Sequence, residues 1–154
     1  VYRALGLPEQ HWPEADSIWL AEAARHTPQL FPGALELLQR LGSQYTLGLV
    51  TSGSRPRVER DLEHNNLTGR FQVIITGGDV CTPKPDPEGL LSALVQLQVA
   101  PTQAVFVGDA AADAEMAQAA GVSFIGVLSQ VSAALPPGDY PRVCSLPELA
   151  QLFT

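Results

Sequence analysis

The chain has 154 residues, of which 45% are hydrophobic and 16% are charged, and its formal net charge is −7. This length is typical of one domain, and the apolar fraction excludes a disordered acidic chain. Because an acidic protein is poorly suited to bind phosphate backbones, and no apolar run approaches the roughly 20 residues that span a bilayer, we expect no nucleic acid partner and no membrane partner.

Residues 1–29 differ in pattern from the rest of the chain. Their apolar residues suit one helix over about residues 13–25, with no strand nearby. We interpret this segment as part of a helical appendage. It ends where Phe31-Pro32-Gly33 enters a second region, residues 30–154.

From Leu30 onwards, short apolar segments alternate with amphipathic helices. In chain order we expect a helix over residues 32–41, a strand over 45–50, a helix over 55–65, a strand over 71–76, a helix over 86–98, a strand over 104–107, a helix over 110–120, a strand over 123–127, a short edge strand over 142–144 and a helix over 147–153. This alternation predicts an α/β fold with a mainly parallel sheet flanked by helices. Ligands bind at the carboxyl ends of such strands, so the polar turns that follow the first three strands form a candidate site.

The two cysteines, Cys81 and Cys144, are far apart and have no His cluster near them. We therefore expect neither a disulfide scaffold nor a zinc site, and a reducing cytoplasm fits this cysteine usage best. We interpret both residues as ordinary small hydrophobic side chains.

The first polar turn, Thr51-Ser52-Gly53-Ser54, lies between a strand and a helix. A helix N-terminus offers unpaired amides and a positive dipole end, which suit an anion such as phosphate. The alternative is an ordinary turn in which Ser54 caps the helix.

The second turn contains Lys84, the only lysine among nine basic residues, with Pro83, Pro85 and Pro87 around it. A chain that otherwise uses arginine indicates that a compact ammonium is needed here, and the prolines restrict where it points. The alternative is a rigid turn that carries a solvated lysine.

The third turn places Asp109 and Asp113 four residues apart at the start of a helix, where they face the same way. Oxygen ligands of this kind suit Mg²⁺, which needs few protein ligands and keeps several waters. The alternative is that Asp109 caps the helix and Asp113 is a solvated acid of its first turn.

In this order and spacing, the three turns resemble motifs two, three and four of the haloacid dehalogenase-like (HAD) superfamily of hydrolases. The resemblance covers about residues 31–127. Phe31-Pro32-Gly33 and Ala120-Gly121-Val122 are similar to the phosphoglycolate-phosphatase-like branch, and residues 1–29 are similar to the C-terminal part of its helical cap. The resemblance implies a Rossmann-like core over residues 30–154.

The resemblance also implies roles for single residues. Thr51 would bind the transferring phosphoryl group through its hydroxyl, with help from the amides of Ser52 and Gly53. Lys84 would neutralise the phosphate and the nucleophile's carboxylate. Asp109 would bind Mg²⁺, and Asp113 would support the ion directly or through water.

The family's first motif is a strand followed by Asp-x-Asp, whose first Asp is the nucleophile, and no Asp-x-Asp occurs in this sequence. We expect an N-terminally incomplete chain without its first strand, and we expect that strand to belong between the strands that end at Val50 and Val107. The 154 residues alone are then expected to be inactive.

The resemblance implies a Mg²⁺-dependent phosphatase that acts on a small phosphorylated metabolite through an aspartyl-phosphate intermediate. One alternative is a non-catalytic, phosphate-binding pseudoenzyme. Another is a different reaction of the superfamily, such as phosphomutase or dehalogenase chemistry.

Overall fold

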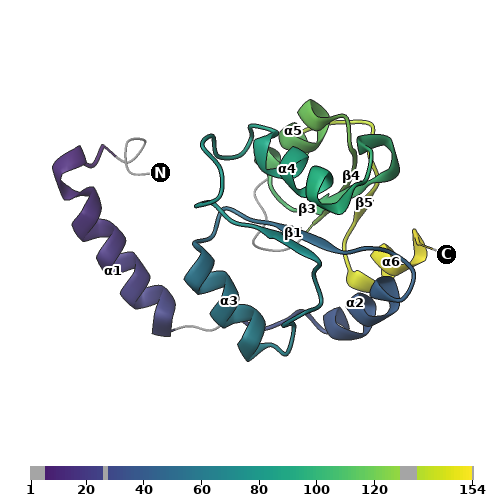
Figure 1. Cartoon of the computed structure of the whole chain (residues 1–154), viewed down its shortest axis with the longest axis horizontal. Coiled ribbons are helices and arrows are strands. Elements are labelled where there is room, and N and C mark those ends of the chain that lie inside the picture. Colours follow the sequence, from purple (N-terminus) through teal and green to yellow (C-terminus); the bar gives the residue numbers. More distant parts are fainter. Residues whose placement is uncertain (1–5, 26–27, 129–134, 154) are drawn as a thin grey trace.

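Short strands alternate with helices along the part of the chain that the structure describes, residues 6–25, 28–128 and 135–153 of a computed structural model (Figure 1). The strands are β1 (Gly48–Val50), β2 (Val73–Ile75), β3 (Val105–Gly108), β4 (Ser123–Val127) and β5 (Arg142–Val143). The helices are η1 (Glu9–His11), α1 (Trp12–Arg25), α2 (Ala34–Gly42), α3 (Arg55–His64), α4 (Glu88–Leu97), η2 (Pro101–Gln103), α5 (Ala111–Ala120) and α6 (Leu146–Gln151). None of these described helices is long and apolar enough to cross a membrane.

The described strands form two parallel sheets. β1 pairs with β2 in one sheet, and β4 lies between β3 and β5 in the other. All three ladders are parallel, so the predicted α/β class with a parallel sheet is confirmed. Among the strands that the structure describes, no ladder joins β1 to β3.

Helices cover both faces of the strands (Figure 1). On one face, Met116 of α5 belongs to a buried cluster that includes Phe124 of β4. On the opposite face, Leu37 of α2 packs in a second cluster with Ile125, the next residue of β4. Since successive side chains of a strand point to opposite faces, β4 contributes to both cores.

The chain crosses the strands in two directions. It moves from β1 through α3 to β2, and then returns through α4, which contacts both β1 and β2, to β3 and β4. β1 and β3 therefore flank the point at which the strand order reverses. In parallel sheets, ligands bind at the carboxyl ends of the strands beside such a point.

The first two strands are shorter than the apolar runs over residues 45–50 and 71–76 predicted. Tyr45 is 48% exposed. The Leu47 amide donates to the Gln72 side-chain oxygen at 2.8 Å, where a strand would use a backbone carbonyl. Apolar character therefore extends beyond the residues that form the ladder.

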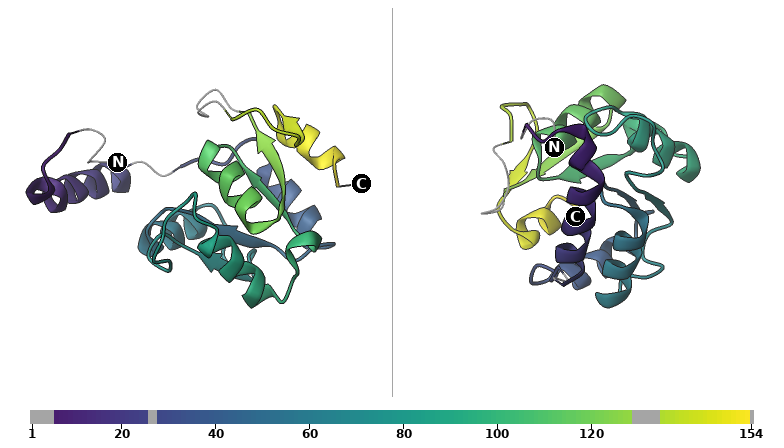
Figure 2. Two further views of the ribbon diagram at one scale, coloured as in Figure 1. Left: turned by 90° about the horizontal axis from the view of Figure 1, so that it is seen from above. Right: turned by 90° about the vertical axis from the view of Figure 1, so that its left-hand side faces the viewer.

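α1 stands apart from the strands (Figure 2). It agrees with the helix predicted over residues 13–25 and begins one residue earlier, at Trp12. Among the described elements, only η1 packs extensively against it. The Trp12 indole donates to the Leu7 carbonyl at 2.9 Å, and Ile18 is 61% exposed.

Both cysteines are exposed, which corrects their interpretation as small hydrophobic residues. Each lies in a loop that precedes a helix, and each uses its backbone amide in a hydrogen bond. The Cys81 amide donates to Glu88, and the Cys144 amide donates to Glu148. The loop geometry, and not burial of the thiol, therefore determines where these residues lie.

The core predicts the effect of truncating Met116, which is 0% exposed. We expect Met116→Ala to lower the free energy of unfolding by about 2 to 5 kcal/mol, because transfer free energy and packing around the cavity are both lost. Urea denaturation measures this loss. Val95→Ala, at a side chain of α4 that is 77% exposed, is the control and should change stability by less than about 0.5 kcal/mol. Equal losses in the two variants would contradict the described core.

Candidate active site

A pocket of about 240 Å³ opens at the carboxyl ends of β1 and β2. Of the residues that the sequence singled out, Thr51, Ser52 and Lys84 line it. Asp109 and Asp113 follow β3 and do not line the pocket. Asp113 nevertheless reaches it indirectly, through an ion pair with Lys84.

The turn after β1 is tied to the turn after β2. The Thr51 amide donates to the Ile75 carbonyl at 2.9 Å, and the Gly77 amide donates to the Gly53 carbonyl at 3.0 Å. A Cβ at Gly77 would lie 2.6 Å from the Ser52 carbonyl oxygen, so only glycine permits this approach. The two turns thus form one wall of the pocket.

The Gly53 amide, for which the family resemblance implied a contact with phosphate, donates to Thr51 Oγ1 at 3.2 Å. That contact uses the hydroxyl oxygen as an acceptor and leaves its hydrogen free to donate to a ligand. The Ser54 side chain makes no capping hydrogen bond to α3, although Ser54 occupies the N-cap position. The alternative interpretation, an ordinary turn in which the Ser54 side chain caps the helix, is therefore not what the structure shows.

Lys84 is held in a fixed position and is not solvated. Its side chain is 16% exposed, and Nζ donates to the Val50 carbonyl at 3.0 Å and to Asp113 Oδ1 at 2.8 Å. The ammonium also lies 5.2 Å from the centre of the Phe106 ring, within cation–π range. These contacts fix one positive charge in the lining of the pocket and exclude the solvated-lysine alternative.

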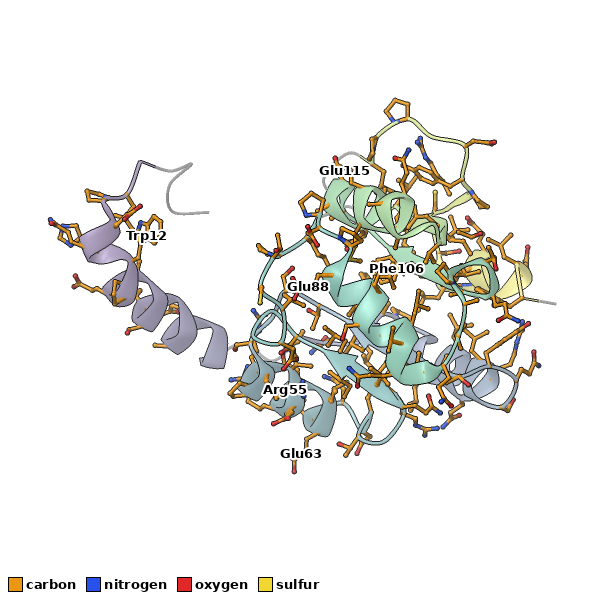
Figure 3. The ribbon with its side chains drawn as sticks, turned by 45° about the horizontal axis from the view of Figure 1, so that its top comes forward. Trp12, Arg55, Glu63, Glu88, Phe106 and Glu115 are labelled. Atoms are coloured by element: carbon orange, nitrogen blue, oxygen red, sulfur yellow. The ribbon has the colours of Figure 1, made fainter. Side chains whose placement is uncertain are left out.

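The loop that carries Lys84 is braced by Glu88 at the start of α4 (Figure 3). The two carboxylate oxygens of Glu88 accept from the Cys81 and Thr82 amides, each at 2.8 Å. These amides lower the pKa of Glu88. Asp86 Oδ1 accepts from the Glu88 amide at 2.9 Å, so Asp86 satisfies one N-terminal donor of α4. The Lys84–Pro85 peptide bond is cis.

Asp113 is buried, with 8% of the residue exposed, and both of its oxygens are used. Oδ1 accepts from Lys84, while Oδ2 accepts from the Asp109 amide at 3.2 Å and the Ala110 amide at 3.1 Å. A Cβ at Gly108 would lie 2.6 Å from the Asp113 Cβ, so the glycine makes room for this carboxylate. The interpretation of Asp113 as a solvated acid is wrong.

The ion pair of Lys84 in the structure is with Asp113. Ala110, not Asp109, is the N-cap of α5, which puts Asp113 at the third helical position. A carboxylate at that position reaches back to the amides that precede the helix, and this brings it inward. Asp109 lies before the helix and is exposed.

A cluster that the sequence reasoning missed lies at the end of β2. Asp79 Oδ2 accepts from the Thr76 amide and hydroxyl, both at 2.7 Å, and from Arg55, which also donates to the Ile74 carbonyl. Arg55 begins α3 (Figure 3), so Asp79 links the start of α3 to the end of β2. The hydrogen bonds from Thr76, followed by that from Arg55, lower the pKa of Asp79 from 3.8 to about 2. In the sequence, the one feature that could have indicated this cluster is the aspartate directly after Gly77-Gly78.

Of the two carboxylates at the β3–α5 turn, one is placed to bind a Mg²⁺ ion directly and the other is not. Asp109 is exposed and can bind a cation directly. Asp113 is already engaged by Lys84 and two amides, so it suits support through a water better than direct ligation. Among the described residues, no three His, Cys, Asp or Glu side chains form a metal-binding group. Mg²⁺ tolerates this, because it is bound by one or two carboxylates, substrate phosphate and waters.

The sequence profile of the haloacid dehalogenase-like hydrolase family matches residues 2–127. The chain belongs to this family. Curated relatives include the phosphoglycolate phosphatases of Salmonella paratyphi A, 38% identical over 110 residues, and of Escherichia coli K12, 36% identical over 110 residues. Each match covers 71% of this chain and 44% of the relative, so the HAD-like chain matches less than half the length of these relatives.

Solved structures agree with this membership. A HAD-superfamily hydrolase of subfamily IA from Geobacter sulfurreducens is 31% identical, with a TM-score of 0.70 over 80% of this chain and 60% of that one. CbbY from Rhodobacter sphaeroides, solved with phosphate and with xylulose-(1,5)bisphosphate, is 27% identical, with a TM-score of 0.74 over 84% of this chain and 60% of that one.

The contact between the first two turns predicts that alanine substitutions at two adjacent glycines differ in their effect on stability. Gly77→Ala should cost about 1 to 3 kcal/mol of unfolding free energy, because its Cβ meets the Ser52 backbone. Gly78→Ala is the control, since a Cβ there has nothing within 4 Å, and it should cost less than about 0.5 kcal/mol. Urea denaturation compares the two. A Gly77 variant as stable as the Gly78 variant would show that the turns are not in contact.

The lowered pKa of Asp79 predicts that the folded chain loses stability as the pH falls. Its stabilising contribution is fully present above its ordinary pKa of 3.8 and is lost as the pH falls towards about 2. The urea midpoint should therefore fall less between pH 5 and pH 2 in Asp79→Asn than in the unmodified chain. An unchanged slope in the Asp79 variant would refute the cluster.

Proposed function

We propose that this HAD-like chain carries the phosphate-binding and cation-binding groups of a Mg²⁺-dependent phosphatase that acts on a small phosphorylated metabolite. The deciding observation is the Lys84 ammonium, fixed by Val50 and Asp113 at a pocket that Thr51 also lines. The curated relatives named phosphoglycolate phosphatases support this reaction class, and the CbbY complexes support a phosphorylated sugar or similar ligand.

In this proposal, the pocket binds the phosphoryl group of the substrate. The Thr51 hydroxyl and the Ser52 amide donate to phosphoryl oxygens, and the Gly53 amide joins them by exchanging its bond to Thr51. Lys84 offsets the negative charge that develops on the phosphoryl oxygens, which is the main contribution a protein makes to phosphoryl transfer. A pocket of about 240 Å³ suits a small metabolite.

Asp109 would hold Mg²⁺, with Asp113 in support. When bound there, the ion would supply further positive charge to polarise the phosphoryl group. The residues of this chain position the lysine, because Asp113 fixes Lys84 and Gly108 makes room for Asp113. These contacts keep the ammonium in the lining of the pocket.

Hydrolysis by this route needs a carboxylate nucleophile. Its oxygen bonds to phosphorus while the P–O bond to the substrate's alcohol breaks, and the leaving alkoxide takes a proton from solvent. Water then cleaves the aspartyl phosphate, which releases inorganic phosphate and restores the carboxylate. Since no Asp-x-Asp occurs in the sequence, we propose that the 154 residues alone do not hydrolyse phosphomonoesters.

We propose further that residues 1–29 are the C-terminal part of a helical cap and residues 30–154 the core. The separation of α1 from the strands supports this division (Figure 2). A non-catalytic phosphate-binding protein is the second candidate, since the sequence pairs a phosphate-binding turn with no Asp-x-Asp. Turnover by a chain that has been supplied with a nucleophile separates the two candidates.

The test joins to this chain an N-terminal segment that supplies the family's first motif, a strand followed by Asp-x-Asp. We expect hydrolysis of p-nitrophenyl phosphate by the fusion, its loss in chelator, and no hydrolysis by the 154 residues. Asp109→Asn and Lys84→Arg should each lower kcat at least about 100-fold, because a charge-stabilising group is lost or misplaced. Full activity in chelator would remove Mg²⁺ from the proposal.

Binding of inorganic phosphate to the 154 residues tests the pocket independently of the fusion. Isothermal titration in Mg²⁺ should show affinity at least tenfold weaker for Lys84→Met than for the unmodified chain. Arg60→Met is the control, since it removes one positive charge from α3 outside the pocket lining. Equal affinities in the two variants would exclude Lys84 from phosphate binding.

A further inference from the structure

The turn that joins β1 to α3, residues 51–54, is tied to the end of β2 at alternate residues. The Thr51 amide donates to the Ile75 carbonyl, and the Gly53 carbonyl accepts from the Gly77 amide. Both ties are backbone hydrogen bonds, so neither depends on a charged side chain. They hold the beginning and the middle of the turn, and they leave its end, where α3 begins, to another contact.

The third tie consists of side chains. Arg55, the first residue of α3, donates through Nη2 to the Ile74 carbonyl at 3.1 Å and to Asp79 Oδ2. The same carboxylate oxygen accepts from the amide and the hydroxyl of Thr76, which is 1% exposed. Asp79 thus joins the first residue of α3 to the residue that follows β2.

The ion pair between Arg55 and Asp79 is partly exposed, with 42% and 32% of the two side chains accessible. An exposed pair normally contributes little to stability, because both side chains lose freedom when they pair. Here Asp79 is already fixed by two hydrogen bonds from Thr76, so only the arginine has to be ordered. The buried threonine therefore orders Arg55 through Asp79.

Arg55 has a second carboxylate close by. Its Nη1 lies 3.6 Å from Glu59 Oε1, one turn further along α3. That contact is too long for a hydrogen bond and stays within the helix, so it does not connect α3 with β2. If the charge of Asp79 were removed, Arg55 would pair along the helix, and the end of the turn would lose its tie to β2.

The residues between the three ties line the pocket. Ser52 and Ser54 are exposed and line it together with Thr51. Arg55 and Asp79 are not part of this lining. The orientation of the lining groups therefore depends on how firmly the turn is held against β2, and Asp79 acts on that orientation without reaching the pocket.

We infer that Asp79 is a positioning residue that, through Arg55, fixes the turn of residues 51–54 for the binding of a tetrahedral oxyanion. This role rests on the proposed function, in which the anion is the phosphoryl group of a substrate. Asp79 supports the anion site against the effect of its own charge, since a negative charge near the pocket otherwise repels an anion. Positioning and charge therefore predict opposite signs for the loss of this carboxylate.

The test is isothermal titration of inorganic phosphate in Mg²⁺ into the 154-residue chain and its variants. Asp79→Asn and Arg55→Gln should each weaken phosphate binding at least about fivefold, because misaligned donors lose most of a hydrogen bond. The combined variant should bind no more weakly than the weaker of the two single variants, since both substitutions break the same link.

Charge alone predicts a different pattern. Asp79→Asn would then bind phosphate more tightly, Arg55→Gln would bind it more weakly, and the two effects would nearly cancel in the combined variant. That pattern would overturn the inference. So would an affinity for phosphate that Asp79→Asn leaves unchanged.

Glu59→Gln is the matched control, because it removes one negative charge beside Arg55 without touching β2. Its affinity for phosphate should equal or exceed that of the unmodified chain. A loss as large as that in Asp79→Asn would show that the charge beside Arg55, and not the link to β2, determines the affinity, and the inference would fail.

Hydrogen exchange of the Gly77 amide, which donates to Gly53, reports on the turn without any ligand. In Asp79→Asn this amide should exchange at least about tenfold faster, because the turn opens locally. The Gly126 amide, which donates to the Pro141 carbonyl beside β5, should exchange at its original rate. Equal acceleration at both amides would indicate a general loss of stability, and an unchanged rate at Gly77 would indicate a turn that is held without Asp79. Either result would contradict the positioning role.

The two measurements separate this inference from the proposed function. If the unmodified chain does not bind phosphate, the proposed function is contradicted, whereas faster exchange confined to Gly77 still supports the positioning of the turn by Asp79. If the unmodified chain binds phosphate and Asp79→Asn binds it equally well, the proposed function stands and the positioning role is wrong.

Discussion

One ammonium group links the two sheets of this structure. Lys84 Nζ donates to the Val50 carbonyl at the end of β1 and to Asp113 at the start of α5. The first contact belongs to the two-stranded sheet and the second to the three-stranded sheet, which no ladder joins in the described residues. The same side chain lines the pocket, so the interaction that links the two sheets also positions the charge that would meet a phosphate.

Carboxylates hold the surrounding loops by accepting from backbone amides. Asp79 accepts from Thr76, Glu88 from Cys81 and Thr82, and Asp113 from the two residues before α5. Bonds of this kind are stronger than neutral ones and fix a loop without a buried side-chain network. Part of the chain's negative charge therefore stabilises its own loops.

The sequence predicted the fold class and the order of the helices and strands, because alternating apolar and amphipathic segments reflect burial directly. It also predicted that the prolines around Lys84 restrict its position. The sequence did not indicate which aspartate pairs with Lys84, because helix position, and not residue type, decides which one turns inward. The role of Asp79 was missed because it depends on Arg55, which approaches it only in the folded chain. Exposure of Cys81 likewise depends on loop geometry, which composition does not encode.

The link through Lys84 is tested most directly by a double-mutant cycle with Lys84→Met, Asp113→Asn and the combined variant. Unfolding free energies from urea denaturation give the coupling between the two side chains. The ion pair is largely buried, with 16% and 11% of the side chains exposed, so we predict a coupling of about 1 to 3 kcal/mol. Additive losses, with no coupling, would contradict the claim that this pair joins the two sheets.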